Sequence, residues 1–255
     1  MTAAPPPAGA GRQATPTRGV ARRLPPHLLR AGATAVALTV PVALLAWAVR
    51  AEASAVVEVD EATIRAATDL TRSEPALRTA LLAWQEAFQA RWVNLAGVLL
   101  AVWVWRRHGL RARTAWAVAT VLLAWGLSNV VKLAVQRSRP LVDDAVAHAP
   151  GYSFPSGHAM NTTAAAVALT ALVWPLLGRR GRAVAVTVAT LAVVLTGVDR
   201  VMLGVHYPSD VVAGAFLGGA VAVGSWIGWS GHVGGRDGAR VTGADLPRPT
   251  DGGAR

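Results

Sequence analysis

The order of apolar and charged residues along the chain predicts membrane-spanning helices. Four stretches of 17 to 19 residues contain no charged side chain, and they cover residues 31–49, 115–131, 159–177 and 211–229. A helix needs about 20 predominantly apolar residues to cross the hydrocarbon core of a bilayer, because each residue adds about 1.5 Å. Two weaker apolar runs join them, at residues 92–105 and 183–198. The pattern therefore predicts an all-α protein, a transmembrane bundle of six helices.

The two ends of the chain lack this pattern. Residues 1–27 are rich in Pro, Gly, Ala and Arg, and residues 231–255 are rich in Gly, Arg, Asp and Pro. Segments of such composition cannot bury an apolar core. We therefore expect disordered tails at residues 1–27 and 231–255, on either side of one membrane domain that comprises residues 28–230.

The net charge of +11 is distributed unevenly between the loops. Arginines without neighbouring acids precede the first apolar run, and further groups lie between runs two and three and between runs four and five: Arg12, Arg18, Arg22, Arg23, Arg30, Arg106, Arg107, Arg111, Arg113, Arg179, Arg180 and Arg182. The loop of residues 51–90 instead carries seven acids against three arginines. By the positive-inside rule, this alternation predicts a multi-pass protein of the cell membrane with both termini in the cytoplasm. Charge of this kind orients a membrane protein and argues against nucleic acid as a partner.

Two segments near the first apolar run allow two interpretations each. The small residues of Ala51–Ala55 follow the first run as they would follow a signal peptide, but its long apolar run and long leader favour an uncleaved anchor. Leu77, Leu81, Trp84 and Phe88 recur at the spacing of one helix face. That helix either lies on the outer membrane surface or simply extends the second span.

Two composition details add constraints. The last apolar run contains two pairs of glycines at four-residue spacing, Gly214 with Gly218 and Gly224 with Gly228, and such pairs predict close packing between helices. The chain has no cysteine, which excludes disulfides and thiolate metal sites.

The segment Pro155-Ser156-Gly157-His158 stands at the start of the fourth apolar run. Pro and Ser are typical of helix starts, and Gly removes side-chain bulk. The free N–H groups of the first turn and the positive end of the helix dipole favour an anion there, with the His158 imidazole beside it. On its own, the segment is equally compatible with an ordinary helix cap.

A cationic group follows the third apolar run. Lys132 is the only lysine of the chain against 24 arginines, and Arg139 and Pro140 follow it. One interpretation of Lys132 is a snorkelling side chain at a helix end, a role that arginine would also serve. These cations lie on the predicted outer face, where the positive-inside rule disfavours them, and a bound anion is the simplest compensation. For Arg137 the sequence gives no further reason to expect a bound anion, and its side chain is expected to be solvated.

A histidine and a carboxylate lie between the fifth and sixth runs. Pro208 fits the first turn of the sixth helix, so His206 lies just outside that helix and Asp210 one turn inside it. A carboxylate in this position can hold the Nδ1–H of the imidazole and leave Nε2 free as a nucleophile or base. A His–Asp pair at this spacing is often only structural. Here, however, three outer loops each contribute cations or histidines.

Together these residues match three ordered motifs. Lys132 to Pro140 fits K-x6-R-P, Pro155 to His158 fits P-S-G-H, and Arg200 to Asp210 fits the R-x5-H-x3-D part of S-R-x5-H-x3-D. Over roughly residues 30–230 the chain thus resembles the type 2 phosphatidic acid phosphatase (PAP2) superfamily. That superfamily includes bacterial membrane lipid phosphatases and undecaprenyl-diphosphate phosphatases, with acid phosphatases and vanadium haloperoxidases as soluble relatives.

The resemblance implies a role for each motif residue. His206 would attack phosphorus, oriented by Asp210, and His158 would protonate the leaving oxygen. The phosphoryl oxygens would be held by five groups: Lys132, Arg139, Arg200, the Ser156 hydroxyl and the Gly157 N–H. Phosphoryl transfer depends on positioning and charge stabilisation, so these groups can replace metal ions, and no metal or other cofactor is expected.

One residue departs from the family pattern. The serine expected before Arg200 is Asp199 in this chain. A carboxylate facing the phosphate would repel it, so we expect Asp199 either to point away, paired with Arg200 or Arg137, or to be protonated in the site.

The sequence thus favours a lipid phosphatase whose site lies at the extracytoplasmic helix ends and whose substrate tail stays in the bilayer. Isoprenoid diphosphate, phosphatidic acid and phosphatidylglycerol phosphate present the same head-group chemistry, so the lipid stays open, as does the oligomeric state. One alternative is a phosphotransferase of the same family. Another is a non-catalytic anion-binding or transport protein. Within the spans only Asn129, Asn161 and scattered Ser and Thr are polar, which disfavours transport.

Overall fold

The computed structural model describes residues 25–141 and 146–244, and for residues 232–244 it describes the backbone alone. Over these residues the chain is helical and contains no strand. The elements are α1 (Pro26–Arg50), α2 (Ser54–Ser73), α3 (Pro75–Ala87), α4 (Ala90–His108), α5 (Arg111–Val135), α6 (Gly157–Val173), the short 3₁₀ helix η1 (Trp174–Leu176), α7 (Arg179–Met202) and α8 (Pro208–Ala244).

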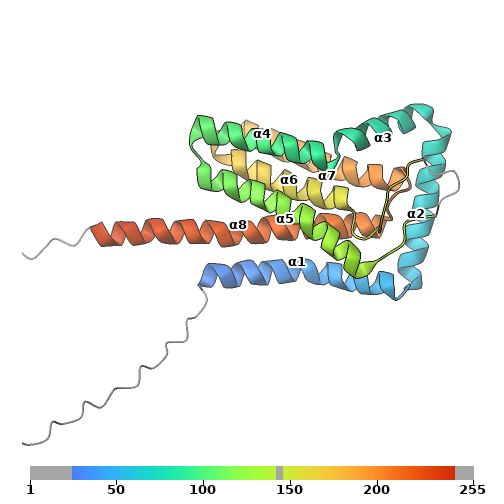
Figure 1. Cartoon of the computed structure of the whole chain (residues 1–255), viewed down its shortest axis with the longest axis horizontal. Helices are drawn as coiled ribbons and strands as arrows, with labels where there is room; N and C mark the ends of the chain where they lie inside the picture. Colours follow the sequence, from blue (N-terminus) through green and yellow to red (C-terminus); the bar gives the residue numbers. More distant parts are fainter. Residues whose placement is uncertain (1–24, 142–145, 245–255) are drawn as a thin grey trace, which may run out of the picture.

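The long helices form a bundle around α6. This helix packs against α4, α5, α7 and α8, while α1 lies alongside α8 at the edge of the bundle (Figure 1). The small residues of α6, among them Ala164, Ala165 and Ala168, are fully or nearly fully buried. Alanines at these positions let the neighbouring helices approach α6 closely.

Within residues 25–141 and 146–244, five helices are long and apolar enough to span a membrane: α1, α5, α6 with η1, α7, and α8 up to Gly231. The pair of α3 and α4 meets the same test together, although it is bent by 51° at its break. Counting this pair as one span gives the six that the sequence predicts. The chain is therefore a multi-pass membrane protein of the all-α class.

The bend between α3 and α4 bears on one of the two interpretations of residues 77–88. This segment is not a straight extension of the second span, since α3 is bent from α4 by 51° and packs against α7. The indole Nε1 of Trp84 donates a hydrogen bond of 3.2 Å to Thr196 Oγ1 of α7.

The helix α2 was not expected from the apolar runs. It crosses the end of the bundle near the start of α8 and contacts α1, α3, α7 and α8 (Figure 1). Its buried residues, Asp60, Ile64, Thr68 and Thr71, recur at spacings of four, four and three and so form one face. A charged residue, Asp60, therefore lies on the buried face of an amphipathic helix.

The predicted tails lie mostly outside the described residues. Residues 1–24 and 245–255 belong to this part of the chain. The helix α8 continues to Ala244, past residue 230, and so enters the segment for which the sequence predicts a tail.

The glycine pairs of α8 pack against two different helices, as their spacing predicts. A Cβ on Gly214 would lie 2.5 Å from the carbonyl oxygen of Ser156, and Gly218 likewise faces the backbone of α6. Gly224 and Gly228 face α1, where a Cβ would make ordinary contacts of 3.4 and 3.5 Å. The close approach of α8 to α6 thus requires glycine at positions 214 and 218. The approach of α8 to α1 does not require glycine at positions 224 and 228.

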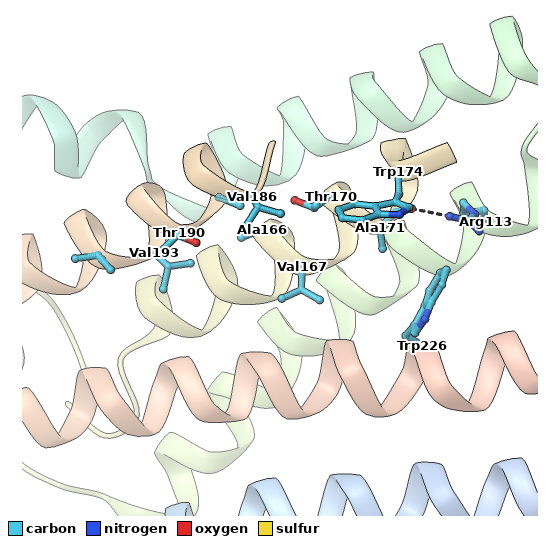
Figure 2. A pocket seen from close by; sticks show the side chains of 12 residues that line it. Arg113, Ala166, Val167, Thr170, Ala171, Trp174, Val186, Thr190, Val193 and Trp226 are labelled. Atoms are coloured by element: carbon cyan, nitrogen blue, oxygen red, sulfur yellow. Dashed lines mark hydrogen bonds between the residues drawn. The ribbon is translucent and has the colours of Figure 1, made fainter. Parts of the chain in front are cut away.

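Two apolar grooves open on the lateral surface of the bundle. One of about 580 Å³ lies along α6 and α7, with Arg113, Trp174 and Trp226 at one end, where Arg113 Nη1 donates a 2.7 Å hydrogen bond to the carbonyl of Ala171 (Figure 2). A longer groove of about 900 Å³ is formed by α4, α6 and α7 and extends from Phe88 to His108 along α4.

Candidate active site

The ends of four helices meet at one end of the bundle: the C-termini of α5 and α7 and the N-termini of α6 and α8 (Figure 1). The backbone holds them together. The N–H of Ser156, just before α6, donates to the carbonyl of Asp210 in α8 at 2.9 Å, and the N–H of Ser153 donates to the carbonyl of Arg137 at 2.9 Å. The three clusters that the sequence singles out are thus brought together.

The start of α6 is built as a helix cap with room for a lysine. The Ser156 Oγ accepts a hydrogen bond from the N–H of Ala159 at 3.5 Å. A Cβ on Gly157 would lie 3.2 Å from Ser128 Oγ and 3.8 Å from Lys132 Cε, so glycine lets the start of α6 approach α5 closely. The Lys132 ammonium donates to the carbonyl of Tyr152 at 2.7 Å. The helix start, whose first N–H groups have no backbone partner within the helix, therefore has a fixed cation beside it.

Arg139 connects the loop after α5 to His206. Its guanidinium donates to three backbone carbonyls, those of Pro150 and Gly151 at 3.0 Å and that of Val205 at 2.6 Å. The Nη1 atom also lies 3.4 Å from His206 Nε2. These contacts hold a positive charge next to the atom that is expected to attack phosphorus.

His206 is buried, with 3% of its surface exposed. Burial lowers the pKa of His206 to about 4, since Asp210 opposes this effect only in part and Arg139 and Lys132 reinforce it. The imidazole is therefore neutral at pH 7, as a nucleophile requires. Its Nδ1 lies 3.6 Å from Asp210 Oδ2, just beyond hydrogen-bond distance. Catalytic hydrogen bonds are often this long before substrate binds.

His158 lies in the first turn of α6, near His206 and near the positive charges of Arg200, Lys132 and Arg139. Its Nε2 is buried and has no hydrogen-bond partner among the described residues. A buried ring nitrogen without a partner is costly, and an oxygen of a bound ligand would satisfy it.

Asp199, the departure from the family motif, pairs with Arg200. The Arg200 Nε donates to Asp199 Oδ2 at 2.8 Å, and Nη2 donates to the same oxygen. The exposed fractions are 2% for Arg200 and 1% for Asp199. The structure thus contains the pairing with Arg200 that the sequence left open. Two of the five guanidinium donors are thereby engaged by this carboxylate.

Arg137 is not solvated, contrary to the expectation from the sequence. Only 12% of its side chain is exposed, and it forms ion pairs with two carboxylates. Its Nη1 donates to Asp210 Oδ1 and to Ser209 Oγ, and its Nη2 donates to Asp60 Oδ2, each at 2.7 Å. Its guanidinium also lies 4.1 Å from the ring centroid of Tyr207.

Sequence reasoning therefore missed two residues of this region, Arg137 and Asp60. Arg137 lies in a loop and has no periodic pattern around it. For Asp60 a signal existed, because it shares a helical row with Ile64, Thr68 and Thr71 and a charged residue in such a row needs a partner.

Comparison with known proteins agrees with this arrangement. The sequence profile of the PAP2 superfamily matches residues 113–232. Decaprenylphosphoryl-5-phosphoribose phosphatase of Mycobacterium tuberculosis is 35% identical over 116 residues, which are 44% of this chain and 59% of that protein. Phosphatidylglycerophosphatase B of Bacillus subtilis is 34% identical over 113 residues, 42% of this chain and 55% of that protein. Lipid A 1-phosphatase of Rhizobium etli is 37% identical over 114 residues, which are 41% of this chain and 45% of that protein.

The match therefore spans between about half and three fifths of the length of these relatives. A solved structure extends the likeness to the fold. The transmembrane PAP2-type phosphatidylglycerolphosphate phosphatase of Bacillus subtilis superposes with a TM-score of 0.64 and 26% identity, covering 81% of this chain and 96% of that one. With the three motifs gathered at one end of the bundle, residues 113–232 of this chain match the PAP2 superfamily.

Proposed function

We propose that the chain is a membrane enzyme that removes phosphate from a lipid phosphate or diphosphate through a phosphohistidine intermediate. One observation carries the proposal. A buried, neutral imidazole, His206, has a carboxylate near Nδ1 and a guanidinium near Nε2, at the point where four helix ends of a membrane bundle meet. A nucleophile, its orienting partner and charge stabilisation are thus present together.

The reaction proceeds in two steps. In the first step His206 Nε2 attacks phosphorus, the bond from phosphorus to the leaving oxygen breaks, and His158 gives that oxygen a proton. In the second step water attacks the phosphohistidine, His158 takes a proton from the water, and the N–P bond breaks to release phosphate. Lys132, Arg139 and Arg200, with the start of α6, stabilise the charge on the phosphoryl oxygens in both steps.

The longer apolar groove supports a lipid as the substrate. Its lining includes Thr162, four residues after His158 in α6, so it begins about 6 Å from the general acid along the helix axis. From there it continues along α4, whose 19 residues rise by about 28 Å, close to the thickness of a bilayer core. The tail of the substrate occupies this groove while its head group lies among the cations.

The test is phosphate release by the purified full chain in detergent. Undecaprenyl diphosphate, phosphatidic acid and phosphatidylglycerol phosphate form the panel, with His206→Gln as the inactive control. We expect release from at least one lipid, inhibition by vanadate, and unchanged activity in EDTA because fixed cations do the work of metal ions. Phosphate that appears on a second alcohol and not in solution would indicate a phosphotransferase. Vanadate binding without turnover of any lipid would indicate a non-catalytic anion-binding protein.

We also infer that the site faces the outside of the cell. The arginine-rich loops lie at the opposite end of the bundle from the site, and the positive-inside rule puts such loops in the cytoplasm. Single cysteines at Ser73, which is exposed, and at Gly178, where a Cβ would contact nothing within 4 Å, test this. An impermeant thiol reagent added to intact cells should label the first and spare the second, and the reverse pattern would refute the orientation.

A further inference from the structure

The contacts of Arg137 reach beyond the family motifs to helix α2. We propose that Asp60 of α2 is a positioning residue that holds Arg137 and the start of α8 so that Asp210 faces His206. The inference rests on the proposed function, in which His206 is the nucleophile. Asp60 lies outside residues 113–232, the part of the chain that matches the PAP2 profile. Its exposed fraction is 2%.

Asp60 completes the cap of helix α8. Asp210 reaches back to the residue before the helix, where its Oδ2 accepts from the N–H of Tyr207 at 2.9 Å. This is half of a capping box; in the other half a side chain of the capping residue accepts an N–H of the first turn. Tyr207 has no short side chain for this purpose. Asp60 Oδ1 replaces it from another helix, since it accepts the N–H of Ser209 at 3.0 Å.

The hydroxyl of Ser209 connects Asp60 to Arg137. It donates to Asp60 Oδ2 and accepts from Arg137 Nη1 at 2.7 Å. Asp60, Ser209 and Arg137 therefore form a closed ring of hydrogen bonds at the start of α8. Such a ring fixes the first turn of the helix, and with it the Cα of Asp210.

Arg137 forms ion pairs with two carboxylates at once. One amino group donates to Asp210 Oδ1 and the other to Asp60 Oδ2, both at 2.7 Å. Burial alone would lower the pKa of Arg137, but Asp210 and Asp60 outweigh burial and raise it above its ordinary value. Without the Asp60 charge, both amino groups would turn to Asp210 and draw its carboxylate away from the imidazole.

Asp60 does not act on phosphate binding. Its hydrogen bonds go to Arg137 and Ser209, and neither is among the residues expected to hold phosphoryl oxygens. The orientation of His206 matters in the transition state, so a loss there lowers kcat and leaves KM nearly unchanged. Misplacing a reacting group by about 1 Å costs roughly 100-fold, and we expect Asp60→Asn to lower kcat by about 10- to 100-fold.

The experiment compares Asp60→Asn with Asp69→Asn, each in the full chain with p-nitrophenyl phosphate and with the lipid found active for the unaltered protein. Asp69 is the matched control, because it lies on the same helix and its side chain is 71% exposed in a pair with Arg72. We expect the kcat of Asp69→Asn to remain unchanged. A double variant that combines Asp60→Asn with Asp210→Asn tests whether Asp60 acts on His206 through Asp210. If Asp60 acts through Asp210, the double variant should be about as slow as Asp210→Asn alone.

A second readout does not depend on turnover. The ¹⁵N chemical shifts of His206, assigned by comparison with His206→Gln, report which ring nitrogen carries the proton. We expect the Nδ1–H form to predominate in the unaltered protein and a mixture of the two forms in Asp60→Asn. An unaltered protein that hydrolyses nothing would refute the proposed function, whereas the tautomer shift would still test the role of Asp60.

Three results would overturn the inference: an unchanged kcat in folded Asp60→Asn, full multiplication of the two losses in the double variant, or an unchanged tautomer of His206. If Asp60→Asn does not fold, Ser209→Ala takes its place. That change removes the bridging hydroxyl and keeps both charges, so we expect a smaller loss of kcat in the same direction. An unchanged kcat in Ser209→Ala would then count as refutation.

Discussion

The Asp199–Arg200 pair leads to a prediction about phosphate affinity. The change is Asp199→Ser, which restores the serine of the family motif S-R-x5-H-x3-D. In the unaltered protein two donors of Arg200 are directed at Asp199 Oδ2, and both residues are almost fully buried. Asp199 and a bound phosphate therefore compete for the same guanidinium. Removing the carboxylate should make phosphate bind more tightly and make the free protein less stable.

The magnitudes follow from the burial of the pair. Breaking a buried ion pair by removal of one partner costs about 3–5 kcal/mol of stability, because the other charge stays buried without compensation. A bound oxyanion regains charge-assisted hydrogen bonds with Arg200, each worth about 1.5–3 kcal/mol. One such bond corresponds to an affinity gain of about 10- to 150-fold.

The assay is thermal unfolding in detergent, with and without orthovanadate, together with a vanadate titration. Asp199→Ser should melt at a lower temperature than the unaltered protein when no ligand is added, and the difference should shrink at saturating vanadate. Asp69→Ser is the control, since an exposed ion pair contributes only about 0–1 kcal/mol. A folded Asp199→Ser protein with the same vanadate affinity as the unaltered protein, or a weaker one, would refute the competition.

Three further predictions concern the roles of the two histidines, the decline of kcat/KM at low pH, and the contact between α8 and the start of α6. His206→Ala should form no phosphoenzyme with any substrate, whereas His158→Ala should still form it from an aryl phosphate, whose leaving group needs little protonation; rapid quench with labelled substrate distinguishes the two. Because the pKa of His206 is about 4, kcat/KM should decline only as the pH falls toward that value. Asp210→Asn should move this decline to lower pH, since the carboxylate favours the protonated imidazole. A decline of kcat/KM near pH 6.5 would show that burial does not lower the pKa of His206. Gly214→Ala should destabilise the protein by about 1–3 kcal/mol through contact with the Ser156 carbonyl, while Gly228→Ala should be nearly neutral; equal melting temperatures for the two variants would contradict the packing.

The sequence by itself determined the all-α membrane class of the protein and predicted the candidate site residues that lie in the three motifs. Apolar runs without charges predict spanning helices because unpaired backbone groups and charges are excluded from the bilayer core. The helix start at Ser156 was readable for a similar reason, since capping depends on neighbours in the sequence. The motif from Arg200 to Asp210 was readable because its spacing fits one loop and one helix turn.

Only the tertiary structure decided how these residues are paired. The sequence left Arg200 and Arg137 open as partners of Asp199 and did not point to Asp60 as a partner of Arg137, because the partner of a buried charge can come from anywhere in the chain. Asp60 is one of the two carboxylates that pair with Arg137, and it lies 77 residues away on a helix that crosses the end of the bundle. The bend between α3 and α4 likewise depends on packing against α7, and no local signal encodes it. Local propensities fix where helices begin and end, whereas the charges inside a bundle are compensated by whichever elements the fold brings beside them.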